Sequence, residues 1–300
     1  MTRTPLTPRQ LGMLLAVLAA FGFSFKAIFV KLAYLSAPVD AITLLSLRML
    51  FSLPLFLLSG YAYLRSGPAL TLKDWALLVF LGLTGYYGAS ILDFAGLQYI
   101  SAGLERVILF TYPTITILIG LLFLDKKASP QLIAALLLCY AGVSLVFVSD
   151  HQLARDSAAP WLGAALVFAS AVSYACYTAF AEVSIGKLGA ARFSILALIV
   201  SILAAQLHFL VTNPISDLIQ PLPIYAYCAA MALFSTVLPI FFQSGAIQRI
   251  GAGPTVLVGM LGPVMTIFFS WLLLAEPLTW VQLAGTALVI AGIYLIRRQS

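Results

Sequence analysis

Long apolar stretches separated by short polar breaks run through the whole chain. The breaks carry turn-forming and charged residues, as at Pro38-Val39-Asp40, Asn213-Pro214 and Glu276-Pro277. A helix needs about 20 apolar residues to cross the hydrocarbon core of a bilayer. Ten stretches reach that length, at 11–35, 41–64, 75–97, 104–124, 131–149, 161–185, 191–211, 223–247, 254–274 and 279–296. The pattern therefore predicts an all-α polytopic membrane protein with ten transmembrane helices.

The composition agrees with this pattern. Mean hydropathy is +1.07, 62% of the residues are hydrophobic and only 9% are charged, whereas soluble domains are about 25% charged. A soluble chain of 300 residues could not bury so much apolar surface. Arg3 and Arg9 precede the first stretch as in a signal peptide, but nine further spans follow it and it contains Lys26. We interpret it as a retained helix.

Basic residues gather on one side of the predicted membrane. If successive stretches cross in alternation, the other side receives only Arg155, with Lys31 at the end of its helix. The side of the N-terminus receives eleven: Arg3, Arg9, Arg65, Lys73, Lys126, Lys127, Lys187, Arg192, Arg249, Arg297 and Arg298. Because basic residues are retained in the cytoplasm, both termini are predicted to be cytoplasmic, in a bacterial inner membrane. The net charge of +6 reflects this bias, so no nucleic-acid partner is expected.

The second half of the chain repeats the first at an offset of 150 residues. Gln98-Tyr99-Ile100-Ser101-Ala102-Gly103 aligns with Gln248-Arg249-Ile250-Gly251-Ala252-Gly253, and 14 of the 48 positions from 98 to 145 are identical at the offset. The predicted units are 1–149 and 150–300, with five helices each. An odd number of spans inserts the second unit upside down, so the prediction is two inverted five-helix repeats around a central cavity.

Matched prolines mark the predicted centre of the two units. Pro113 and Pro263 occupy equivalent repeat positions near the middle of their helices, and Gly262 precedes the second proline. Proline removes a helical hydrogen bond, and matched breaks in two repeats often point to a transport site. We therefore assign these three residues to hinges or kinks. The alternative is kinking for packing alone, without any contact to a solute.

Three ionisable residues fall at membrane depth, where a charge is costly and often functional. Arg48 lies near the midplane of its helix, and Lys26 and Asp93 lie in the outer halves of theirs. They would contact a zwitterionic solute or form a proton-sensitive gate. Alternatively, Asp93 pairs with Lys26 or Arg48 for structure alone, or Lys26 snorkels. Residues nearer the segment ends are expected in solvated or interfacial positions: Glu105, Arg106, Glu182 and His208.

Aromatic residues supply further candidates for the cavity lining. A tyrosine hydroxyl needs a partner in an apolar medium, so tyrosines within spans suit flat or amphipathic solutes, although packing explains each one singly. The candidates are Tyr86, Tyr87, Tyr112, Tyr174 and Tyr177, with Ser90 and Gln243 as polar neighbours.

Catalytic and metal-binding patterns are missing from the sequence. It contains no HExxH, P-loop or CxxC motif. Cys139, Cys176 and Cys228 lie within apolar stretches, as small buried residues do. We expect neither an enzyme nor a cofactor or metal. The expected partners are a small-molecule substrate and the lipid bilayer, and a monomer is compatible with the sequence.

Several segments resemble the drug/metabolite transporter superfamily, EamA type. They are Leu97-Gln98-Tyr99-Ile100-Ser101-Ala102-Gly103 running to Pro113, Ala246-Ile247-Gln248-Arg249-Ile250-Gly251-Ala252-Gly253 running to Pro263, and Ala275-Glu276-Pro277-Leu278-Thr279 with Gln282 to Gly292. The length and central tyrosines are similar to YddG-type exporters of aromatic amino acids. The first unit departs from the family motif, because it has Asp125-Lys126-Lys127 where the motif has a glutamate. Any role of the motif glutamate in this chain therefore rests on Glu276 of the second unit.

The resemblance implies export of small metabolites by alternating access. We expect a secondary transporter of small amphipathic metabolites, with amino acids, including aromatic ones, as solutes. An exchanger of nucleotide sugars or phosphate esters remains an alternative, although it needs several cavity-facing cations. A passive channel is a second alternative, although no repeated filter residues are present. Energy coupling, by proton antiport or facilitated diffusion, is left open.

Overall fold

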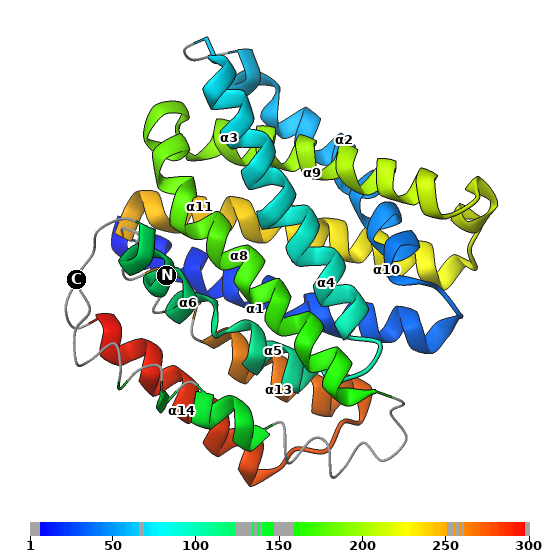
Figure 1. Ribbon diagram of the computed structural model, residues 1–300, viewed down its shortest axis with the longest axis vertical. Helices are drawn as coiled ribbons and strands as arrows, with labels where there is room; N and C mark the ends of the chain where they lie inside the picture. Colours follow the sequence, from blue (N-terminus) through cyan, green and yellow to red (C-terminus); the bar gives the residue numbers. More distant parts are fainter. Residues whose placement is uncertain are drawn as a thin grey trace, which may run out of the picture.

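The computed structural model describes residues 7–65, 69–123, 134, 137, 138, 140–146, 159–250, 255, 258, 259 and 261–297. Its described elements are all helical (Figure 1). The α-helices are α1 (Pro8–Ser36), α2 (Ala41–Arg65), α3 (Leu72–Gly82), α4 (Ala89–Gly96), α5 (Ala102–Leu109), α6 (Tyr112–Phe123), α8 (Pro160–Leu188), α9 (Ala190–Thr212), α10 (Leu222–Ala232), α11 (Leu238–Ile250), α13 (Leu261–Leu274) and α14 (Trp280–Arg297). Shorter segments are the π-helices η1 (Leu83–Gly88) and η3 (Leu233–Val237) and the 3₁₀-helix η2 (Ile215–Leu218).

Seven helical spans in the described part of the chain are long and apolar enough to cross a membrane. Three of them combine consecutive elements, namely α3 to α4, α5 with α6, and α10 with the start of α11. Two shorter apolar helices follow, Leu261–Leu274 and Trp280–Gly292. The prediction of a multi-pass helical membrane protein is confirmed at this level. Part of the predicted span 131–149 lies outside the described residues.

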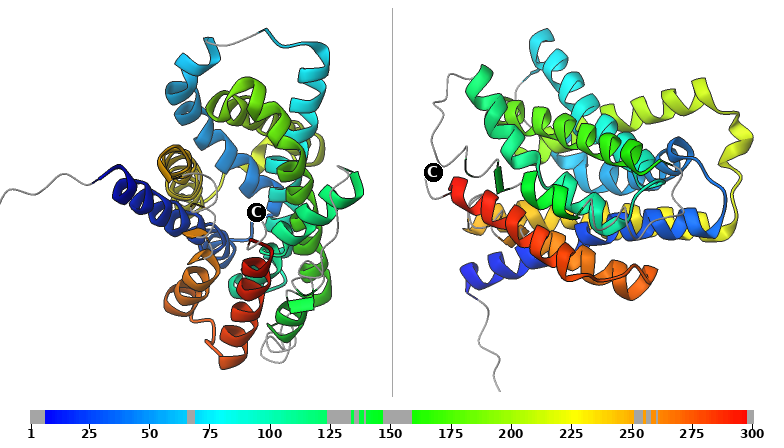
Figure 2. Two further views of the ribbon diagram at one scale, coloured as in Figure 1. Left: turned by 90° about the vertical axis from the view of Figure 1, so that its left-hand side faces the viewer. Right: turned by 60° about the horizontal axis from the view of Figure 1, so that its bottom comes forward.

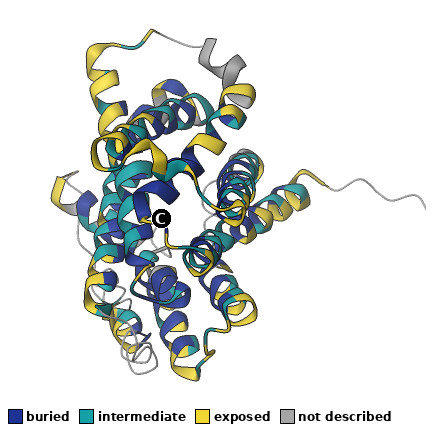
Figure 3. Ribbon diagram, turned by 90° about the vertical axis from the view of Figure 1, so that its right-hand side faces the viewer, coloured by how far each residue is buried: buried dark blue, intermediate teal, exposed yellow. Residues whose placement is uncertain are grey.

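The exposed surface of the bundle is strongly apolar. Large side chains such as Leu58, Leu72 and Ile219 are largely exposed on the outside, while buried positions face inward (Figure 3). Trp161 and Trp280 are exposed at the first turns of α8 and α14. An apolar exterior with tryptophans at helix ends fits a protein whose outer solvent is lipid.

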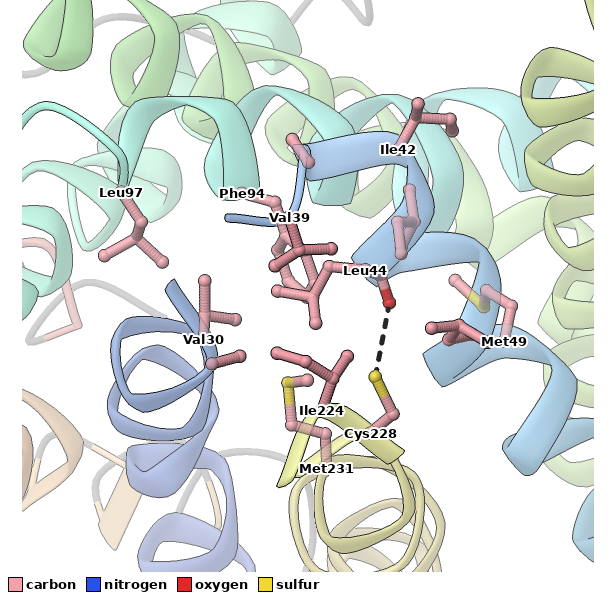
Figure 4. Close-up of a cluster of buried hydrophobic side chains, with 14 of the residues drawn as sticks. Val30, Val39, Ile42, Leu44, Met49, Phe94, Leu97, Ile224, Cys228 and Met231 are labelled. Carbon is pink, nitrogen blue, oxygen red and sulfur yellow. Dashed lines mark hydrogen bonds between the residues drawn. The ribbon is translucent and has the colours of Figure 1, made fainter. Parts of the chain in front are cut away.

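The largest core cluster joins helices that are distant in sequence. It contains Ile28 and Val30 of α1, Leu44 of α2, Phe94 of α4 and Met231 of α10 (Figure 4). In the same cluster the Cys228 Sγ donates to the Leu44 carbonyl at 3.7 Å. Cys228 is a free, buried thiol, as the sequence predicts.

Glycines allow the closest approaches between helices. α1 lies beside α11 and α13, α2 beside α9, and α4 beside α8 (Figures 1 and 2). A Cβ added to Gly96 of α4 would lie 3.0 Å from the Gly163 carbonyl oxygen of α8. One added to Gly82 would lie 2.7 Å from the Ala197 carbonyl oxygen of α9. Small residues at such crossings let backbones pack closely in membranes.

Two π-helical segments lie 150 residues apart. η1 begins at Leu83 and η3 at Leu233, and α3 and α10, which precede them, begin at Leu72 and Leu222. Both starting positions therefore differ by the offset found in the sequence. Periodicity alone could not predict these segments. One extra residue in a turn shifts the phase of the pattern, but the shift does not show in spans that are apolar almost throughout.

The helix containing Pro113 is broken rather than gently kinked. α5 ends at Leu109 and α6 begins at Tyr112. The Thr111 hydroxyl donates to the Ile108 carbonyl at 2.8 Å, which satisfies a group that the break frees. Pro113 then stands in the first turn of α6, where its missing N–H costs little. Pro263 and Gly262 are buried in the first turn of the described α13.

Candidate functional site

A buried cluster of charges joins α1, α4 and α5. Lys26 Nζ lies 2.6 Å from Asp93 Oδ2 and 3.9 Å from Glu105 Oε1. Arg106 Nε lies 3.8 Å from Glu105 Oε2. We call Lys26, Asp93, Glu105 and Arg106 the charge cluster. The sequence offered Lys26 or Arg48 as the partner of Asp93, and the structure selects Lys26.

The expectation of a solvated or interfacial position for Glu105 and Arg106 is wrong. Glu105 is 0% exposed and Arg106 is 5% exposed. The Arg106 guanidinium donates to the Phe23 carbonyl of α1 at 2.8 Å. These residues follow the cap of α5, which places them beneath α1 instead of at the membrane surface. Residue counting along a helix cannot show which neighbour covers a helix end.

Arg48 lies beside the cluster on α2. Its Nη2 donates to Ser90 Oγ at 3.1 Å, and its guanidinium carbon lies 4.9 Å from the centre of the Phe94 ring. The ring provides a cation–π contact that offsets part of the cost of burying the charge. Two predicted site residues, Arg48 and Ser90, are thus brought together, one helical turn from Asp93 along α4.

Four of the predicted tyrosines form a connected aromatic cluster. The Tyr112 and Tyr174 rings meet edge to face at 4.9 Å, and Tyr174 stacks on Tyr177 at 5.5 Å. The hydroxyls of Tyr177 and Tyr86 lie 3.0 Å apart and share a hydrogen bond. The tyrosine cluster, defined as these four residues, therefore connects η1, α6 and α8.

Two other candidates lie apart from the tyrosine cluster. The Tyr87 hydroxyl lies 2.8 Å from His208 Nδ1 of α9. This contact explains the half-buried His208, for which the sequence suggested an interfacial role. Gln243 is half-buried in α11. The backbone of Glu182 lies in α8, and its side chain lies outside the described residues.

The charge and tyrosine clusters are neighbours. Arg106 lies in α5, and Tyr112 begins α6 directly after the break between the two helices. Since Tyr112 contacts Tyr174, the break joins the two clusters along the chain. A charged group beside aromatic faces can recognise a solute that carries both a charge and a flat apolar part.

The residues next to the two matched prolines also approach each other. The ideal Cβ position of Gly262 lies 3.5 Å from the Phe110 ring, which belongs to the break between α5 and α6. Ser24 of α1 donates to the Gly262 carbonyl at 3.2 Å, and Thr266 donates to the Ser24 carbonyl at 3.2 Å. The described start of α13, which carries Pro263, is therefore held against α1, the helix that carries Lys26.

Glu276, on which the sequence places any role of the motif's acid, has a structural role as a helix cap. It lies between α13 and α14, yet its carboxylate accepts hydrogen bonds from the amides of Ala102 at 3.0 Å and Gly103 at 3.4 Å. These amides open α5, where a helix has unpaired donors and a positive dipole end. The acid of the second unit thus caps a helix of the first.

The rest of that motif forms the turn around Glu276. Ala275 has a positive φ of 54°, and the Glu276 amide donates to the Ser270 carbonyl at 3.3 Å, as after a helix C-terminus. Thr279 and Gln282 then exchange backbone and side-chain hydrogen bonds at the start of α14. The pattern is a capping box, so the motif positions Glu276.

Comparison with family models identifies one family, and the similar proteins found are transporters. The model of the EamA-like transporter family matches residues 10–148 and again 161–298. The uncharacterized transporter YcbK of Bacillus subtilis is 28% identical over 91% of this chain and 88% of its own length. An uncharacterized transporter of Archaeoglobus fulgidus is 25% identical over 93% of this chain and 95% of its own. A crystal structure at 17% identity covers 96% of this chain and 98% of its own with a TM-score of 0.64, which supports the fold.

Proposed function

Because the chain belongs to the EamA-like transporter family, we propose that it is a secondary transporter that exports small amphipathic metabolites by alternating access. Amino acids, including aromatic ones, are the proposed solutes. The observation that carries this proposal is that the charge cluster on α5 and the tyrosine cluster that begins with Tyr112 of α6 adjoin each other along the chain. Ionisable residues within a membrane mark a functional site by default, and charge beside aromatic rings suits a zwitterionic or aromatic solute.

The proposed architecture is ten spans in two inverted units, 1–149 and 150–300, around a central cavity. The repeated spacing of η1 and η3 and the double family match support the duplication. Contacts between loops support the crossing pattern, since residues in contact at helix ends must lie on one side of the membrane. Asn213 donates to Asp40 at 3.2 Å, which joins two loops that the proposal places outside.

A second loop contact bears on the number of spans. Lys187 pairs with Asp74 at the exposed ends of α8 and α3. Between these residues the described chain holds three spans, namely Leu72–Gly96, Ala102–Gly120 and Pro160–Ala181. Returning to the same side requires an even number. A fourth crossing, which the sequence assigns to 131–149, satisfies this requirement and supports the inverted arrangement.

The decisive experiment is a counterflow screen with the purified protein in liposomes. The panel contains aromatic and aliphatic amino acids, nucleotide sugars and sugar phosphates. Saturable counterflow of amino acids is expected, which a passive channel would not give. Preference for a phosphate ester would support the alternative exchanger. That class is less favoured because Lys26 and Arg106 already pair with carboxylates and Arg48 donates to Ser90.

Proline substitutions test the hinge assignment in the same assay. Pro113→Ala and Pro263→Ala are expected to reduce counterflow at least tenfold, because alanine, unlike proline, can continue a helix through a proposed hinge. Pro54→Ala is the matched control, since Pro54 lies inside α2 and the equivalent repeat position is Ala204. Failure of every solute in the panel, with both hinge variants indistinguishable from the parent, would refute the proposal.

A further inference from the structure

Glu105 is a buried carboxylate whose pairing is incomplete. The side chain is 0% exposed, and both carboxylate oxygens lack a hydrogen-bond donor among the described residues. The nearest cations, Lys26 and Arg106, lie at 3.9 and 3.8 Å, beyond hydrogen-bond distance. An ionised carboxylate in an apolar interior normally accepts several hydrogen bonds. One more ligand is therefore expected at this position.

Asp93 lies next to this carboxylate. Its Oδ2 contacts the same ammonium group of Lys26 at 2.6 Å. The sum of the two distances from Lys26, 6.5 Å, is the most that can separate the Asp93 and Glu105 oxygens. Both carboxyl groups therefore share one ammonium group and lie close together in a buried position. Two ionised carboxylates this close repel each other, and one bound proton removes the repulsion.

We infer that Asp93 and Glu105 form an intramembrane proton-binding site in which the two carboxyl groups share one proton. The shared proton turns two repelling acceptors into a donor and an acceptor, as in other carboxyl pairs. It also supplies the donor that Glu105 lacks. The pair titrates as a unit, so the proton belongs to both residues.

Surrounding groups set the charge balance of this pair. Without the shared proton, Lys26 and Arg106 balance the two carboxylates; with it, the charge cluster carries one net positive charge. Other charged and titratable groups lie near the pair or its flanking residues. They are Tyr34 of α1, which donates to the Phe94 carbonyl, Arg48 of α2, Tyr112 of α6, and Glu276 at the start of α5. Proton uptake therefore loosens the hold on Lys26, the most exposed member of the cluster at 18%.

Only the role of this proton site in transport rests on the proposed function, in which a released Lys26 contacts an anionic group of the solute. The site itself can be measured without any solute. Infrared spectra distinguish a protonated carboxyl group from a carboxylate. Purified protein at neutral pH should show an infrared band of a protonated carboxyl group. The band should persist after the solvent is exchanged for heavy water, which shifts the bands of exposed acids.

Two variants assign the band to the pair. Glu105→Gln keeps the shape of the side chain and supplies an N–H donor to Asp93, so it should fold while losing the band. Asp93→Asn should lose it as well. Asp217→Asn is the matched control, because Asp217 lies in η2 and accepts from Asn213 outside the spans. A pH titration should show about one proton fewer bound per chain in each pair variant.

Separate outcomes distinguish the proton site from the transport proposal. Absence of the band in the parent protein, or its persistence in Glu105→Gln, would overturn the proton site whatever the solute screen finds. Presence of the band with no solute transported would leave the site standing and refute the transport proposal. Where counterflow is found, its rate should vary with pH in the parent and in Asp217→Asn but not in Glu105→Gln.

Discussion

Single residues in this protein carry charge and backbone strain that the surrounding structure has to offset. The Lys26–Asp93 pair could be anticipated from the sequence, because an ionisable residue at membrane depth needs a partner. Glu105 and Arg106 could not, because the sequence shows no covering neighbour at the start of their helix. A signal was nevertheless present, since both residues interrupt an otherwise apolar run from Ala102 to Phe110.

Removing one partner of the buried pair should destabilise the fold. Lys26→Ala leaves Asp93 and Glu105 without their common cation, and the expected loss is about 3–5 kcal/mol of unfolding free energy. The double variant Lys26→Ala, Asp93→Ala should recover part of it. Thermal unfolding in detergent measures both. Lys187→Ala breaks the more exposed pair with Asp74 and should cost about 0–1 kcal/mol; equal losses at the two sites would contradict the burial argument.

Ala275 is a second strained residue, and its strain can be relieved. Its φ of 54° favours glycine. Ala275→Gly should therefore raise the unfolding free energy by about 0.5–1 kcal/mol. The same change at Ala284, inside α14 and exposed on the bundle surface, should lower it by about 0.5–1 kcal/mol. Melting temperatures that shift in the same direction for both variants would argue against strain at Ala275.

At the scale of elements, the sequence predicts where helices lie better than how they are broken. The predicted stretches 41–64 and 191–211 correspond closely to Ala41–Arg65 and Ala190–Thr212. The proline at position 113 predicts an irregular helix there. The full separation of α5 from α6 also depends on local hydrogen bonds, in which the Thr111 hydroxyl donates to the Ile108 carbonyl and the Phe110 amide donates to the Arg106 carbonyl. The π-helical segments depend on packing, which apolar periodicity does not encode.

η1 supports the tyrosine cluster through a glycine. A Cβ on Gly85 would overlap the Tyr177 ring and lie 2.9 Å from the Tyr177 Cβ, which cannot move without its helix. Gly85→Ala should cost about 1–3 kcal/mol and separate Tyr177 from Tyr86, with a measurable change in tyrosine ultraviolet absorbance. Gly259→Ala, at a position with nothing within 4 Å, should be neutral or stabilising by up to about 1 kcal/mol. Equal destabilisation would contradict this assignment.

At the scale of the whole molecule, the sequence predicts the class of protein well and its solute poorly. Hydropathy and duplication indicate a transporter-like bundle, whereas solute identity depends on a few side-chain positions that hydropathy does not determine. The proposed orientation can be tested with single cysteines. Ser216→Cys in η2 should react with an impermeant thiol reagent added outside intact cells, and Lys187→Cys should not. Equal labelling at both sites, in a background without native cysteines, would contradict the crossing pattern.

In the alternating-access scheme proposed above, Glu276 makes the two faces of the carrier unequal. Opening the face that it closes requires two backbone donors to leave a carboxylate. At the matching position, 150 residues earlier, Lys126 has no acceptor to offer. The two gates of one duplicated protein thus differ in strength, and a difference of 1.4 kcal/mol alters a conformational ratio tenfold. Without solute, the carrier is then expected to populate mainly the conformation that is open to the cytoplasm, from which a solute for export binds.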